Sequence, residues 1–213
     1  QQATDILPAS YSDLGNLIAI DGSLIDGVLS MDWAEYRKKS KKAKAHVGFN
    51  INNGSPYKAF ITDGNGGERP FVNQILKPGQ TSVTDRGYQC HKTFDIIQEE
   101  GKSFICRIRE NTTKTVLKQN SIADGSIVFF DSVVILGCET SVQTQRDVRL
   151  IAYTIEDTHY WIATNRFDLT AEQIAEAYKL RWEIESFFAW WKRHLAVYHI
   201  LARSEYPLKV QIF

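Results

Sequence analysis

Four residues near the carboxyl end of the chain have types and a spacing that suit phosphodiester chemistry. They fit the pattern Y-x2-R-x3-E-x6-K and are Tyr178, Arg181, Glu185 and Lys192. At about 100° per residue, an α-helix would place them within an arc of roughly 60° on one face. The carboxylate could hold a cation while the guanidinium, ammonium and phenol hold phosphate oxygens. Ordinary salt bridging between Arg181 and Glu185, four residues apart, would produce the same stripe.

A single helix that begins near residue 170 is predicted to carry this stripe. Thr170 and Gln173 form a capping-box pattern, which marks a helix start. The stripe lies beside an apolar face, where charged groups need partners, and this position favours a functional role. The apolar face consists of Ala177, Leu180, Ile184, Phe187, Phe188, Trp191 and Leu195.

Two aspartates end predicted β-strands earlier in the chain. Residues 17–22 have the pattern of a buried strand that ends in an acid at Asp21, and residues 81–85 have that of a strand ending in Asp85. With Glu185, these acids would meet at one edge of a sheet. Mg²⁺ prefers oxygen ligands and is commonly held by a few carboxylates together with substrate phosphate. We therefore predict Asp21, Asp85 and Glu185 as catalytic ligands of Mg²⁺ or Mn²⁺, with two ions in the site. Taken alone, each aspartate also suits a turn or cap.

The rest of the pattern predicts an α/β fold in which helices flank a mixed sheet. Further strands are expected at 46–52, 56–62 and 103–108, and helices at 33–39, 68–76 and 90–100. From residue 110 the pattern changes to short β-like runs with turns between them, at 116–117, 127–130, 133–136, 148–153 and 160–163.

This change of pattern divides the chain into four parts. They are the end of an upstream segment (1–16), the first part of a catalytic core (17–109), a β-rich insertion (110–165) and a catalytic helix that completes the core (166–213). The chain starts at Gln1 and stops within what has the pattern of another element at 207–213, so we interpret it as a piece of a longer protein.

Composition limits how the chain could meet nucleic acid. The 213 residues include 25 basic and 25 acidic ones, for a formal net charge of zero, so affinity must come from local patches. One patch is the basic run at 37–44, where Lys41, Lys42 and Lys44 are candidate phosphate contacts and a solvated loop is the alternative. Three cysteines without C-x-x-C spacing favour reduced thiols in a cytoplasmic protein. No run has transmembrane length.

These motifs resemble the catalytic core of bacterial DDE transposases of the insertion-sequence-4 family, within the RNase H-like superfamily. The resemblance covers roughly residues 17–200, and the long final motif is its most specific part. In chain order the matching motifs are Ile20-Asp21-Gly22-Ser23, Lys44 to Phe49 followed by Gly54-Ser55-Pro56, Thr84-Asp85-Arg86-Gly87-Tyr88, and the pattern from Tyr178 to Lys192.

The resemblance implies an RNase H-like sheet and cut-and-paste DNA transposition. Members hydrolyse the DNA at the ends of the element and then transfer the freed 3′-hydroxyl into target DNA. Transposon-end and target DNA are therefore the expected partners, with a homodimer on paired ends and a nucleoid-associated location. The metal-binding triad implied by the family is Asp21, Asp85 and Glu185.

Further residues are expected to contact the DNA. The resemblance assigns phosphate contacts to Tyr178, Arg181 and Lys192. It also matches Trp161 and Trp182 to positions where a flipped base stacks during hairpin formation, although packing is the alternative for each. Arg86, next to Asp85, could reach phosphate or pair with an acid of the triad.

Two other functions stay open at this point. An RNase H-like nuclease would hydrolyse without strand transfer, but the long segment between Ile108 and Thr170 disfavours it, since a simple nuclease core reaches its last helix sooner. An inactive DNA-binding remnant is disfavoured by the complete set of three acids. A strand-transfer assay on pre-cut ends separates both from transposition.

Overall fold

The computed structural model describes residues 7–26, 32–37, 40–140 and 142–194. Several predicted features lie outside these residues: 1–6 of the upstream segment, 38–39 of the basic run, Leu195 of the apolar face and the segment 207–213. No helix in the described part is long and apolar enough to cross a membrane.

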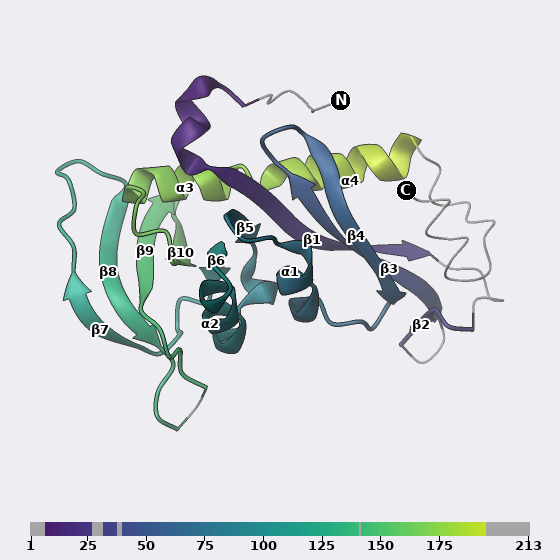
Figure 1. Cartoon of the computed structure of the whole chain (residues 1–213), viewed down its shortest axis with the longest axis horizontal. Coiled ribbons are helices and arrows are strands. Elements are labelled where there is room, and N and C mark those ends of the chain that lie inside the picture. Colours follow the sequence, from purple (N-terminus) through teal and green to yellow (C-terminus); the bar gives the residue numbers. More distant parts are fainter. Residues whose placement is uncertain (1–6, 27–31, 38–39, 141, 195–213) are drawn as a thin grey trace.

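Ten strands of the described chain join one large mixed sheet, in the order β2-β3-β1-β5-β6-β10-β9-β8-β7, with β4 paired to β3 (Figure 1). The central strands β1, β5 and β6 run parallel, and the other neighbours are antiparallel. The strands are β1 (Asn16–Asp26), β2 (Glu35–Tyr36), β3 (Ser40–Asn50), β4 (Ser55–Asp63), β5 (Gln80–Thr84), β6 (Ser103–Ile108), β7 (Lys114–Gln119), β8 (Val128–Leu136), β9 (Val148–Ile155) and β10 (Thr158–Thr164).

Helices cover both faces of the sheet, with α3 and α4 on one side and α1 and α2 on the other (Figure 1). Successive residues of a strand point to opposite faces. In β1, Leu17 and Ala19 pack in the core under α3 and α4, while Ile18 and Ile20 pack in the core with α1 and α2. A strand buried on both faces is apolar, as residues 17–20 of β1 are. The helices are η1 (Ala9–Leu14), α1 (Arg69–Ile75), η2 (Arg86–Tyr88), α2 (His91–Glu99), α3 (Ala171–Lys179) and α4 (Trp182–His194).

The region before β3 differs from its prediction. The prediction of a helix at 33–39 was wrong, because Glu35 and Tyr36 pair with β3 as a short strand, and Arg37 turns the chain with φ 50°. The prediction of a basic loop was also wrong, because residues 40–44 belong to β3 and pair with β1 and β2. From Lys42 to Ala45 lysine alternates with alanine, and both alanines are buried, which fits a strand with one buried face.

Residues 110–165 form the outer part of the same sheet. β10 pairs with β6, and β9, β8 and β7 follow in turn. The separate runs expected at 127–130 and 133–136 are one strand, β8, whose ladder to β9 shifts register between Val128 and Phe130. The polar pair Asp131 and Ser132 separates the two runs in the sequence, but both residues are buried within β8.

The single helix predicted from residue 170 is two helices. The capping box at Thr170 and Gln173 is confirmed and begins α3. The chain then tightens at residues 180–181, where Arg181 N–H donates to the Tyr178 carbonyl (3.1 Å) and Ile184 N–H to the Arg181 carbonyl (3.2 Å), both three residues back. The four residues of the Y-x2-R-x3-E-x6-K pattern are therefore divided between two helices, with Tyr178 on α3, Glu185 and Lys192 on α4, and Arg181 at the break between them.

Candidate active site

Asp21 and Asp85 occupy equivalent positions on neighbouring parallel strands. The ladder between β1 and β5 pairs Ala19 with Val83, and each aspartate stands two residues further along its chain. Because alternate residues share a face, both lie on the side of Ala19 and Val83, which α3 and α4 cover. Asp85 directly follows β5, as predicted, but Asp21 does not end its strand. β1 continues to Asp26 because it stays paired with β3.

A third carboxylate, Glu68, joins the two aspartates. It immediately precedes α1 and forms an ion pair with Lys44 of β3. A methyl group added at Gly22 would fall 2.9 Å from Glu68 Oε1, and one added at Gly87 would fall 3.4 Å from Oε2. The Glu68 carboxylate thus lies close to the residue after Asp21 and to the turn after Asp85. Sequence reasoning missed Glu68, since a lone glutamate before a helix carries no distinguishing signal.

The crowding of these acids changes their electrostatics. The pKa of Asp21 is raised to about 6, chiefly by burial. The charges of Asp85 and Glu68 contribute to this rise, and the Gly22 N–H at 2.8 Å partly offsets it. Burial and the three carboxylates also raise the pKa of the Tyr88 phenol. The Tyr88 hydroxyl is buried and has no hydrogen-bond partner among the described residues. The site therefore concentrates negative charge where little water can screen it.

Glu185 connects to this cluster through Arg181. Glu185 lies in the first turn of α4, and its carboxylate forms a 2.7 Å ion pair with Arg181 Nη2. The Arg181 guanidinium in turn lowers the pKa of Asp21, so it lies within electrostatic reach of that aspartate. Across the described ranges, no three His, Cys, Asp or Glu side chains are grouped closely enough to hold a metal ion. The structure thus brings Asp21 and Asp85 together, while Glu185 is paired with Arg181.

Arg107 of β6 extends the row formed by the two aspartates. The β5–β6 ladder pairs Thr84 with Cys106, so Arg107 stands beside Asp85, and it shares the face of Ile105. Its guanidinium lies 4.4 Å from the ring centre of Tyr160. Burial raises the pKa of Tyr178, and the nearby charges of Arg181 and Arg107 oppose this rise. Sequence reasoning missed Arg107 too. A cation inside the apolar strand at 103–108 was a usable signal, because charged residues rarely enter such strands unpaired.

The predicted phosphate contacts lie in different surroundings. Tyr178 on α3 is only 5% exposed, and Lys192 is half-buried in the last turn of α4. Arg86 is exposed on η2, beside Asp85. The lysines of the basic run have partners on the protein: Lys41 Nζ donates to the Asp32 carbonyl (3.2 Å), Lys42 pairs with Asp26, and Lys44 pairs with Glu68.

The two candidate tryptophans also differ. Trp182, in the first position of α4, is 61% exposed, and the Arg181 guanidinium lies 5.6 Å from its ring centre. Trp161 on β10 packs against Phe129 and Phe130, and Lys114 Nζ lies 4.5 Å from its ring. Trp161 therefore packs within the outer sheet, whereas Trp182 presents an open ring face.

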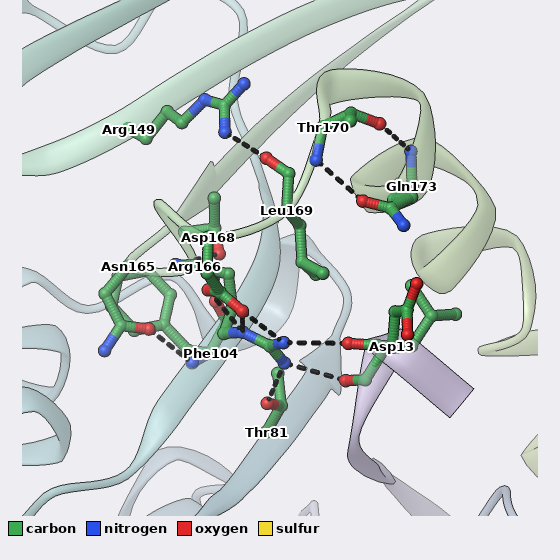
Figure 2. A network of polar contacts seen from close by, with 12 residues as sticks. Asp13, Thr81, Phe104, Arg149, Asn165, Arg166, Asp168, Leu169, Thr170 and Gln173 are labelled. Carbon is green, nitrogen blue, oxygen red and sulfur yellow. Dashed lines mark hydrogen bonds and ion pairs between the residues drawn. The ribbon is translucent and has the colours of Figure 1, made fainter. Parts of the chain in front are cut away.

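A polar network fixes the segment that leads into α3 and the site helices (Figure 2). Arg166 Nη1 donates to the Leu14 carbonyl (2.8 Å) and to Thr81 Oγ1 (2.9 Å), and its Nη2 pairs with Asp168. Arg149 Nη1 donates to the Leu169 carbonyl at 2.5 Å. These bonds tie the start of α3 to β5 and β9, and so they hold Tyr178 and Arg181 over the same part of the sheet as the aspartates.

Comparisons with known proteins agree with this arrangement. The sequence matches the family described as Transposase DDE domain across residues 13–213. It is 27% identical over 186 residues to a Geobacillus stearothermophilus protein, provisionally named a transposase for insertion sequence element IS5377, covering 86% of this chain and 49% of that protein. It is likewise 27% identical over 187 residues to a provisionally named transposase, y4zB, of Sinorhizobium fredii, covering 85% of this chain and 52% of the other.

A third relative is provisionally named a transposase for insertion sequence element IS4SA of Synechocystis, with 23% identity over 183 residues that cover 81% of this chain and 50% of that protein. The chain thus spans about half the length of the curated relatives it matches. The family match takes in both strand aspartates and the helix that carries Glu185. The resemblance found in the sequence is therefore confirmed, and the chain belongs to the DDE transposase family of insertion sequences.

Proposed function

We propose that this chain is the catalytic domain of a DNA transposase that hydrolyses phosphodiester bonds at transposon ends and transfers the 3′-hydroxyl into target DNA. The observation that supports this most is the placement of Asp21 and Asp85 at equivalent positions of adjacent parallel strands. Rigid strands hold two carboxylates at fixed separation, as a phosphoryl-transfer site requires. Membership of the DDE transposase family supplies the reaction class.

The acids suit a hard divalent cation. Burial is the main cause of the raised pKa of Asp21, and the charge of Asp85 adds to it; a bound cation would relieve both effects. We propose that both aspartates hold Mg²⁺ or Mn²⁺ and that Glu185 completes the set once Arg181 releases it. When bound, two such ions supply positive charge to the attacking oxygen and to the leaving 3′-oxygen. Glu68 stays paired with Lys44 and restricts the space beside the aspartates.

The surrounding cations and aromatic residues would hold the DNA. Arg181, freed from Glu185, has its guanidinium within electrostatic reach of Asp21 and would take a phosphate oxygen. Arg86 and Lys192 would contact the backbone on either side. Trp182 offers an exposed ring face for a flipped base, and the packing of Trp161 against Phe129 makes it the weaker candidate. Tyr178 would act by orienting Arg181, whose guanidinium lies 5.8 Å from its ring centre.

The fold fits the same proposal. We propose that segments 17–109 and 166–213 form an RNase H-like core and that 110–165 is an insertion that widens its sheet. Simple hydrolysis would not need this wider sheet, so we favour transposition over a nuclease. We further propose a cytoplasmic protein that works on nucleoid DNA as a homodimer on paired ends.

Cleavage of duplexes that carry the termini of the encoding element tests the proposal. We expect Asp85→Asn and Glu185→Gln to abolish Mg²⁺-dependent cleavage, a loss of at least about 10³-fold, because each removes a ligand charge while keeping shape. Glu183→Gln is the matched control, since Glu183 is exposed on the same turn of α4. Equal activity of Glu185→Gln and Glu183→Gln would refute the role of Glu185. If the protein cleaves DNA but does not join pre-cut ends to target DNA, it acts as a nuclease and not as a transposase.

A further inference from the structure

A surface hollow of about 490 Å³ opens beside the candidate active site. It lies between the first residues of α1 and α2 and the chain just after β6. Its polar lining is almost entirely basic, and no carboxylate contributes to it. The residues that carry the inference are Arg69, Lys92, Arg109, His91 and Gln89.

The cations of this hollow are available for a ligand. Arg69, Lys92 and Arg109 are exposed, and none of them forms an ion pair with any carboxylate of the described residues. By contrast, Lys42, Lys44, Lys102, Arg149, Arg166 and Arg181 each hold a carboxylate. In a chain of zero net charge, unpaired cations gathered around one concavity form the kind of local patch that attracts a polyanion.

The hollow is built rigidly. The Gln89 side chain accepts a hydrogen bond from Arg109 N–H (3.0 Å) and donates one to Thr112 Oγ1 (3.0 Å), so it joins η2 to the turn after β6. Thr112 Oγ1 then donates to the Arg109 carbonyl (2.6 Å). On the opposite wall, His91 Nδ1 lies 2.7 Å from the Val142 carbonyl. The cationic side chains therefore project from a fixed frame, which lowers the entropy lost on binding.

Two further hydrogen bonds link the hollow to Asp85 of the candidate active site. Arg69 Nε donates to the Gly87 carbonyl (3.1 Å), and Gly87 N–H donates to Asp85 Oδ1 (2.8 Å). Arg109 follows β6 as Asp85 follows β5, and these two strands are parallel neighbours. A DNA strand that passes the aspartates could thus place its next phosphates over the hollow.

We propose that this hollow binds the phosphodiester backbone of duplex DNA next to the bond that is cut, with Lys92 and Arg109 as direct phosphate contacts and Arg69 positioned between the hollow and Asp85. The proposal rests on the function proposed above and adds a second contact surface to it. The hollow lies outside the pattern from Tyr178 to Lys192 and outside the basic run of β3, whose lysines already have partners on the protein.

The test is the salt dependence of DNA binding, measured by fluorescence anisotropy with a labelled duplex in EDTA, where no cleavage occurs. The double variant Lys92→Gln/Arg109→Gln should lower the slope of log affinity against log salt by about two and weaken binding at 0.1 M salt by about tenfold or more. The control Lys77→Gln/Lys118→Gln removes the same charge elsewhere. Lys77 lies before the amino end of β5, and Lys118 lies on the edge strand β7.

Each outcome decides the proposal. A slope for Lys92→Gln/Arg109→Gln equal to that of the control would overturn it, while loss of cleavage in Asp85→Asn would still uphold the proposed function. The charge-preserving variant Lys92→Arg/Arg109→Lys should keep the wild-type slope, and a loss there as large as in the neutral variant would also overturn it. If inorganic phosphate at constant ionic strength binds only the wild type while the DNA slopes agree, the hollow is a free-anion site instead.

Discussion

Asp21→Asn should make the metal-free protein more stable at neutral pH, although it removes a residue of the candidate site. Ionised Asp21 is partly buried next to Asp85 and Glu68, and its pKa is raised from 3.8 to about 6. At about 1.4 kcal/mol for each pH unit, that difference corresponds to about 3 kcal/mol of lost stability once the carboxyl is ionised. Asparagine has nearly the same shape, can still accept from Gly22 N–H, and carries no charge.

The sign of the pH dependence follows from linkage. Between about pH 4 and pH 6 the folded protein holds a proton on Asp21 that the unfolded chain has released, so stability falls as pH rises through this window. Below it the carboxyl is protonated in both states, and above it the full penalty remains. The stability difference between Asp21→Asn and wild type should therefore be small at pH 4 and should reach about 3 kcal/mol near pH 7.

Urea unfolding in EDTA at several pH values measures this difference. In thermal unfolding the same change corresponds to a rise of about 6–12 °C for a chain of this size. Asp157→Asn is the matched control, since Asp157 is exposed in the β9–β10 turn with φ 62°, a conformation that asparagine tolerates. Added Mn²⁺ should stabilise wild type and not Asp21→Asn. A variant no more stable than wild type at pH 7, or a difference that does not change with pH, would refute the argument that crowded carboxylates destabilise the site.

Two further substitutions test what positions the site helices. Arg149→Met should cost about 3–5 kcal/mol, because it leaves the Asp131 carboxylate buried without its 2.6 Å partner, and Asp131→Leu/Arg149→Met should recover much of that loss in urea unfolding. If Arg149→Met alone unfolds at the wild-type midpoint, the pair has no such role. Thr170→Ala should cost about 1 kcal/mol by removing the cap of α3, whereas Thr115→Ala on the edge strand β7 should cost less. Equal costs would show that the cap contributes nothing.

The parts of the fold that were predictable are those with strong local signals. Residues 103–108 are mostly apolar and form β6 with the predicted bounds, and the capping box at Thr170 begins α3. Errors arose where pairing at a distance decides the structure. The lysines of 40–44 have the composition of a solvated loop, but they lie in a strand because β1 and β2 flank it. No pattern within that run reveals its neighbours.

Individual residues of the site could be predicted from the sequence, but their arrangement in space could not. Both aspartates could be found because acids that follow apolar strands gather at one sheet edge, and the register places them side by side. The break at residues 180–181 was not predictable, since Tyr178 to Ile184 keep a helical spacing of apolar and polar residues across it. Glu68 was missed because it enters the site only through the packing of α1 against β3 and η2.

Ion pairs around the site distinguish Asp21 and Asp85 from the two other acids nearby, and this difference supports the proposal that these two aspartates bind a metal. Glu68 has Lys44 as its own cation, and Glu185 has Arg181. Asp21 and Asp85 form no ion pair with any described residue, and their carboxylates accept only backbone N–H groups, from Gly22 and Gly87. Two negative charges without an ion-pair partner, on rigid neighbouring strands, suit the divalent cations proposed above. In that proposal Glu185 would join them by giving up Arg181, which would then be free for a phosphate. Assembly of the metal site and capture of the DNA backbone would thereby be coupled through the Arg181–Glu185 ion pair.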